Sequence, residues 1–232
     1  MNLTIMLQIS FELTERVEHS FTLILASVLF CFMLIAIVNF NNSQLFYMVS
    51  KRFFLFKFNE NNFNDDSRLN FGSVIILNIN FFISLLLCTF LFFSNSTSLD
   101  ATFFYSFIFS LYIFVIQQLS LLLITFFSKH SKTIDLAKAL THQTLHFGGF
   151  IFLVLALFWS LNRGGELNFP LAFILILSFL FSFRFIKAAA LSLGIGIKWY
   201  YIILYICSLE ILPSFIFYHF LVIKTGAFHL IL

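Results

Sequence analysis

Long apolar runs alternate with short polar stretches along this chain. A helix that crosses a lipid bilayer needs about 20 mostly apolar residues. Runs that meet or approach this length occupy residues 21–40, 73–93, 101–127, 147–162, 170–187 and 199–223. The pattern predicts an all-α, polytopic membrane protein with about six transmembrane helices, in which residues 1–232 form a single integral membrane domain.

The composition supports helices in a membrane. The chain is 61% hydrophobic and only 10% charged, whereas a soluble domain has about 25% charged residues. It contains 38 Phe but only 8 Gly and 2 Pro, so helix-breaking residues are rare. Long runs with few breakers fit spanning helices better than the alternating short strands of an outer-membrane barrel.

The Lys and Arg residues predict how the chain is threaded, because they gather in cytoplasmic loops. The first, third and fifth connections, with the adjoining helix ends, hold Lys51, Arg52, Lys57, Arg68, Lys129, Lys132, Lys138, Arg184, Lys187 and Lys198. The opposite side holds only Arg16, Arg163 and Lys224. We therefore expect both termini to face away from the cytoplasm. The stretch before the first run is acidic, unlike a signal peptide, so that run is expected to stay as a helix.

Two cytoplasmic stretches predict interfacial helices. Residues 44–58 mix aromatic side chains with Lys51 and Arg52, which is typical of a helix that lies among lipid headgroups. Residues 131–146 are amphipathic at helical spacing. We expect the fourth spanning helix to follow at residue 147 or to begin inside this amphipathic stretch.

His142 and His146 lie four residues apart in the second stretch, so a helix would place both imidazoles on one face. A metal pair needs that spacing, but no Glu follows the first His as in the metalloprotease motif. Lys138 belongs to the same stripe and its positive charge opposes metal binding. The two histidines are thus weak metal candidates, and a solvated or headgroup-facing stripe is the simpler interpretation.

Glu210 is the most informative single residue. It lies about 16 Å along the last run, near the middle of the bilayer. A charged side chain there costs at least about 2.5–3.5 kcal/mol, so it normally faces the bundle or a wet cavity, or stays protonated. Pro213 has no N–H for the carbonyl of Leu209, which leaves an acceptor beside the acid.

Other polar residues can be placed at a similar depth. Cys207 and Ser214 share the helical face of Glu210, and Tyr200 lies on its flank. On neighbouring helices Arg184, Gln117 and Asn78 lie in the cytoplasmic half, with Gln118 and Asn80 beside the last two. We expect a polar layer containing Glu210. Three roles are open for this layer. It could be an interhelical hydrogen-bond clamp around a neutral Glu210, or a proton or ion relay, and a catalytic site ranks last.

The last run resembles a known family. Its residues Tyr205, Cys207, Ser208, Leu209, Glu210, Ile211, Pro213 and Tyr218 resemble the C-terminal Y-x-C-[ST]-L-E-I-x-P helix of an uncharacterised Bacteroidota family of polytopic inner-membrane proteins, known as a domain of unknown function. The resemblance implies a multi-pass protein of the bacterial inner membrane, so both termini are predicted to be periplasmic. It implies no activity.

Two classes of function follow from these observations. The first is a non-catalytic subunit or assembly factor of an envelope complex, with a membrane or envelope protein as partner besides the lipid bilayer. The second is a small transporter or lipid-handling protein that uses Glu210 as a protonatable site. No catalytic set is evident, so an enzyme acting on a lipid ranks third. We expect no cofactor, and no basic stripe predicts nucleic-acid binding.

Overall fold

The computed structural model describes residues 3–41, 45–54, 71–94, 99–127, 131–162 and 168–194, and these ranges are helical apart from short turns. The helices are α1 (Leu3–Asn41), α2 (Leu45–Phe54), α4 (Phe71–Phe93), α5 (Leu99–Phe127), α6 (Ser131–Leu161) and α7 (Phe169–Gly194). The predicted all-α fold is confirmed. The sixth predicted span, residues 199–223, lies outside the described residues.

Within the described part of the chain, every helix except α2 is long and apolar enough to cross a membrane. The spans are Thr22–Asn41, Phe71–Phe93, Ala101–Leu119, Ala137–Leu161 and Phe169–Ala190. The protein is therefore a membrane-embedded helical protein. Four of these spans overlap closely with predicted runs, and the span in α6 begins inside the amphipathic stretch, at the earlier of its two predicted starts.

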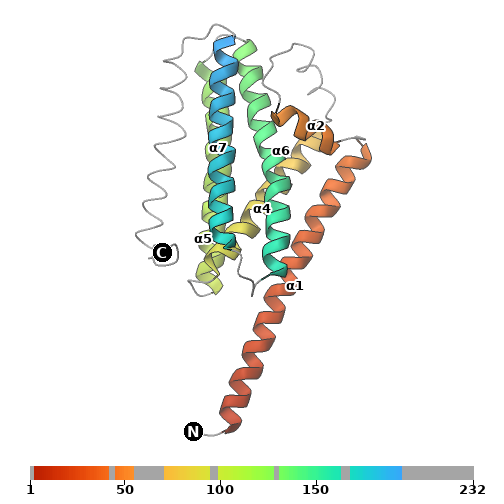
Figure 1. Cartoon of the computed structure of the whole chain (residues 1–232), viewed down its shortest axis with the longest axis vertical. Helices are drawn as coiled ribbons and strands as arrows, with labels where there is room; N and C mark the ends of the chain where they lie inside the picture. Colours follow the sequence, from red (N-terminus) through yellow and green to blue (C-terminus); the bar gives the residue numbers. More distant parts are fainter. Residues whose placement is uncertain are drawn as a thin grey trace.

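The helices form a bundle with α4 and α6 at its centre. α4 packs against α6, α5 and α1, and α6 also packs against α7 and α2. The short helix α2 lies against the side of the upper part of the bundle in Figure 1, and we call this end of the bundle the α2 end. The N-terminal half of α1 extends beyond the other helices at the opposite end (Figure 1).

Two adjacent glycines let α4 and α6 approach closely. A Cβ atom added at Gly149 would lie 3.1 Å from the Cα of Phe81 and 3.1 Å from Nδ2 of Asn80. At Gly148 an added Cβ would lie 3.1 Å from the Phe81 ring and 3.3 Å from Leu180 of α7. Small residues at a contact between membrane helices bring backbones together and increase van der Waals packing. The glycine pair thus holds α6 between α4 and α7.

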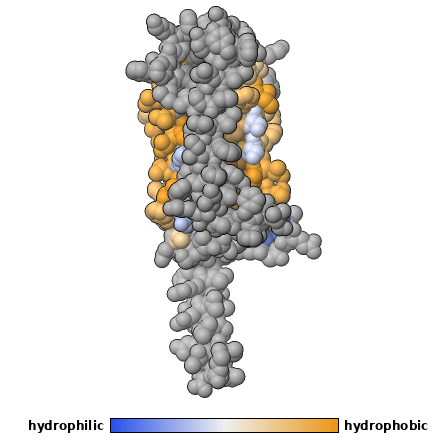
Figure 2. All heavy atoms as spheres, turned by 90° about the vertical axis from the view of Figure 1, so that its left-hand side faces the viewer, coloured by the Kyte–Doolittle hydropathy of each residue, from blue (hydrophilic) through white to orange (hydrophobic). Residues whose placement is uncertain are grey.

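The outer helices present apolar side chains to the surroundings. Examples with more than half of the side chain exposed are Leu23 and Leu29 on α1, Phe103 and Phe104 on α5, and Leu175 on α7. In Figure 2 hydrophobic residues cover both flanks of the bundle that are visible in this view. A soluble protein does not expose apolar surface on this scale, so these faces are suited to contact with lipid.

The prediction for α6 needs a correction. The amphipathic stretch 131–146 and the apolar run 147–162 form one continuous helix of 31 residues, and not an interfacial helix followed by a span. Its spanning segment begins at Ala137, inside the amphipathic stretch, which agrees with the earlier of the two predicted starts. The polar side of the amphipathic stretch is accommodated because other helices cover it, with Thr141, Thr144 and His146 all buried.

The short helix α2 agrees with the predicted position of the first interfacial helix, although residues 55–58 of the predicted stretch lie outside the described residues. Leu45, Val49 and Phe53 form its buried face. Phe46, Tyr47 and Phe54 are exposed, and Nζ of Lys51 lies 5.3 Å from the centre of the Tyr47 ring. An outward face of aromatics and a cation is typical of the membrane–water boundary.

Candidate functional site

Polar side chains from three helices lie at one level of the bundle. Oγ1 of Thr89 (α4) is 3.0 Å from Oγ of Ser110 (α5), which aligns these two helices. From that contact toward the α2 end, Asn80 is about 13.5 Å along α4 and Gln117 is about 10 Å along α5. His146 is about 4.5 Å along α6 from Gly149, which contacts Asn80. Asn80, Gln117 and His146 therefore form a polar layer.

Each member of this layer is buried. The exposed fractions are 1% for Asn80, 3% for Gln117 and 4% for His146. Neither Oδ1 nor Nδ2 of Asn80 has a hydrogen-bond partner in the described part of the chain. Buried amides nearly always have such partners. Asn80 thus marks a level at which the bundle interior can accept a further polar group.

Helix α7 adds two buried cations on the α2 side of the layer. Arg184 is 6% exposed and Lys187 is 4% exposed. Both lie within the last two helical turns of the apolar span Phe169–Ala190. Nη2 of Arg184 donates to Oγ1 of Thr141 (3.2 Å). Nζ of Lys187 donates to Oε1 of Gln143 (2.8 Å) and to the carbonyl of Phe53 (2.9 Å). These bonds join α7 to α6 and to the C-terminal end of α2.

Aromatic rings close the site at its α2 end. The Phe53 ring stacks on Phe147 of α6 with centroids 4.1 Å apart, and on Phe183 of α7 with centroids 4.5 Å apart. Phe54 meets the rings of Phe147 and Phe183 edge-on. Because the Phe53 carbonyl also accepts from Lys187, one residue of α2 is held by both an aromatic stack and a charged hydrogen bond.

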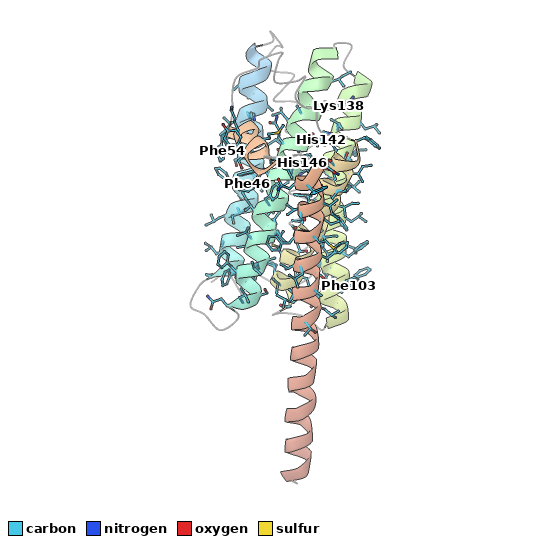
Figure 3. The ribbon with its side chains drawn as sticks, turned by 90° about the vertical axis from the view of Figure 1, so that its right-hand side faces the viewer. Phe46, Phe54, Phe103, Lys138, His142 and His146 are labelled. Atoms are coloured by element: carbon cyan, nitrogen blue, oxygen red, sulfur yellow. The ribbon has the colours of Figure 1, made fainter. Side chains whose placement is uncertain are left out.

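His142 and His146 share one face of α6, as their spacing predicts. Their ring centroids are 5.7 Å apart, and Figure 3 shows Lys138, His142 and His146 following one another along the helix. The solvated-stripe interpretation is correct for Lys138, which is exposed, but wrong for His146, which is buried. Among the described residues no group of three or more His, Cys, Asp or Glu side chains can hold a metal ion.

The structure tests only part of the predicted site. It places Gln117 and Arg184 in buried positions and Asn78 in a half-buried position near the layer, next to the more deeply buried Asn80. The other predicted residues, Glu210, Cys207, Tyr200, Ser214 and Pro213, lie outside the described residues. Their membership of the layer stays a prediction.

Sequence reasoning did not single out Lys187, Thr141, Gln143 or Phe53 as site residues. Lys187 follows Arg184 by three residues in an apolar run, and this helical spacing is a signal that the sequence contains. The contact of Lys187 with Phe53 has no such signal, because 134 residues separate the two.

Comparison with known proteins gives one match. Residues 24–221 match a family described as a domain of unknown function, DUF4271. No curated protein and no solved structure matches the chain. The match covers every described span except for the first two residues of the span in α1. It confirms the predicted resemblance to a family of unknown function, whereas the Bacteroidota origin and the C-terminal motif stay predictions.

Proposed function

We propose that this chain, which belongs to the DUF4271 family of unknown function, is a small transporter or lipid-handling protein built around a protonatable polar layer. The observation that carries the proposal is the burial of Arg184 and Lys187 together with Asn80, Gln117 and His146 inside a lipid-embedded bundle. Ionisable groups at membrane depth are costly, and where proteins retain them they commonly serve substrate or ion pathways.

The charge balance of the layer supports a role for Glu210. Arg184 and Lys187 bring two positive charges to this level, and their bonds to Thr141, to Gln143 and to the Phe53 carbonyl hold them there. A buried cation is stabilised by a nearby anion. Glu210 is the acidic residue that lies within an apolar run. We propose that its ionised carboxylate faces Arg184 and that protonation releases this interaction.

Substitutions at Glu210 separate a working carboxyl from a structural one. Glu210→Gln keeps the shape and hydrogen-bonding ability but cannot change charge. We expect it to accumulate at the wild-type level and fail to complement a strain that lacks the gene, whereas Glu210→Leu should also reduce accumulation. In a purely structural clamp Gln would complement nearly as well as Glu. Equal, full complementation by Gln and Leu would exclude both roles.

The function itself is tested by purifying the protein from native membranes in a mild detergent and identifying bound molecules by mass spectrometry. We expect the protein to retain a lipid or small molecule in stoichiometric amount. Loss of that molecule in Arg184→Gln, but not in Gln118→Ala, would link it to the buried cations. A protein that carries no such molecule in stoichiometric amount would contradict the proposal.

One observation favours the second function, a non-catalytic subunit or assembly factor. α1 has 39 residues and is therefore about 58 Å long, nearly twice the thickness of the hydrocarbon core. Its N-terminal half extends beyond the bundle (Figure 1), where it is available to another envelope protein. A stoichiometric protein partner in the same purification, lost when residues 2–20 are deleted, would favour this function.

We further propose that the protein lies in the bacterial inner membrane with both termini in the periplasm. The Lys and Arg side chains that the structure describes lie near the α2 end: Lys51 belongs to α2, Lys187 bonds to Phe53 of α2, Arg184 is one turn from Lys187, and Lys138 lies above His142 in Figure 3. Excess positive charge favours the cytoplasmic side. Alkaline phosphatase, which is active only in the periplasm, should therefore be active when fused after Leu232. An inactive but intact fusion would contradict this orientation.

A further inference from the structure

Lys138, His142 and His146 form a stripe that leads from the surface into the polar layer. They lie at successive four-residue steps of α6, each about 6 Å farther along the helix. Their exposure falls in the same order: Lys138 is exposed, His142 is half-buried and His146 is only 4% exposed. In Figure 3 the three labelled side chains descend along α6 from the α2 end.

The chemistry of the stripe suits proton movement. A neutral imidazole has one nitrogen that donates and one that accepts, so it can take up a proton at one nitrogen and release another from the other nitrogen. The ring centroids of His142 and His146 are 5.7 Å apart, a separation that one bridging water can span. Imidazoles at this spacing can therefore pass a proton along the helix.

The surroundings of the pair are well defined. Of the elements packed against α6, α7 contributes the charged side chains Arg184 and Lys187, and α2 contributes Lys51. Arg184 and Lys187 donate to Thr141 and Gln143, the residues on either side of His142. Residues 22–41 of α1, 71–93 of α4 and 101–122 of α5 contain no charged residue, and their polar groups are mainly amides, hydroxyls, thiols and tyrosines.

We infer that His142 and His146 form a proton-entry path that connects the aqueous surface beside Lys138 to the polar layer. His142 exchanges protons with water, and His146 exchanges them with His142. The role of this path rests on the proposed function, because the path would supply protons to the polar layer. The exchange itself is measurable whatever the role of Glu210.

The test is the rate at which imidazole N–H protons exchange with water, measured by NMR on the full chain labelled with 15N-histidine in lipid nanodiscs. In the wild type, the His146 side chain should exchange much faster than the backbone amides of its own helical turn. His142→Asn, which keeps a polar side chain but cannot relay a proton, should slow exchange at His146 by about a hundredfold, the scale of one acid–base group. Gln118→Asn, a conservative change at a half-buried amide of α5, serves as the control and should leave the rate unchanged.

Two results would overturn the inference. One is wild-type exchange at His146 that is as slow as that of the neighbouring backbone amides, which needs no variant. The other is an unchanged His146 rate in His142→Asn. If His142→Asn does not fold, the wild-type exchange rate at His146 still decides the question. Full complementation by Glu210→Gln, together with fast exchange at His146, would reject the proposed function but keep the path.

Discussion

Gly149→Leu is expected to destabilise the protein by about 3 kcal/mol or more, because the new side chain would push α4 and α6 apart. The added Cβ alone would lie 3.1 Å from the backbone Cα of Phe81, and a backbone cannot turn aside as a flexible side chain can. For a chain of this size the melting temperature should fall by about 6 °C or more. Thermal unfolding of the purified protein in detergent measures the effect.

Gly72→Leu is the matched control. Gly72 lies in α4, and an added Cβ there would meet nothing within 4 Å. The substitution should leave stability unchanged or raise it by up to about 1 kcal/mol, since Leu has the higher helix propensity. If the two Leu variants melted at the same temperature, the close α4–α6 contact would not be a determinant of the fold.

Phe53→Ala should lower the free energy of unfolding by about 3 kcal/mol, the lower end of the range for a buried Phe. The lower end applies because lipid as well as water can surround α2 once the ring is lost. The ring is 1% exposed and stacks on both Phe147 and Phe183. Its loss removes both stacks and leaves the bond between Lys187 and the backbone of residue 53 as the main described tie between α2 and α7. We expect α2 to detach, which limited proteolysis near residues 45–54 would detect.

Phe54→Ala provides the control for this prediction. The neighbouring ring is 54% exposed and meets the same partners only edge-on. Its removal should cost less than about 1 kcal/mol, and α2 should remain protected from protease. Equal effects of the two substitutions would show that α2 is not anchored through Phe53.

The sequence predicted the spans well because insertion into lipid depends on the length and apolarity of each run. Both ends of α4 and α5 and the start of α7 lie within two residues of the predicted runs, whereas α7 ends at Gly194 and not at residue 187. For the span in α6 the sequence left two starts open, residue 147 or a position inside the amphipathic stretch, for a physical reason. Residues 137–146 contain Thr, Gln and His side chains that composition assigns to an interface, yet packing against α4 and α7 buries several of them.

The polar layer was only partly predictable. Counting 1.5 Å per residue placed Gln117, Asn78 and Arg184 at similar depths before any contact was known. Depth alone does not show which side of a helix faces inward, so Asn80 was not preferred over Asn78. The Lys187–Phe53 bond joins residues that are distant in sequence, and only the packed bundle reveals it.

The proposed function depends most on a Glu210 carboxyl that gains and loses a proton inside the membrane. Infrared difference spectra of the reconstituted protein between two pH values test this directly, because a protonated carboxyl has its own carbonyl band. We predict a pH-dependent band that disappears in Glu210→Gln and persists in Gln118→Ala. A Glu210-dependent band that does not change with pH, or no band that depends on Glu210, would contradict a protonatable site.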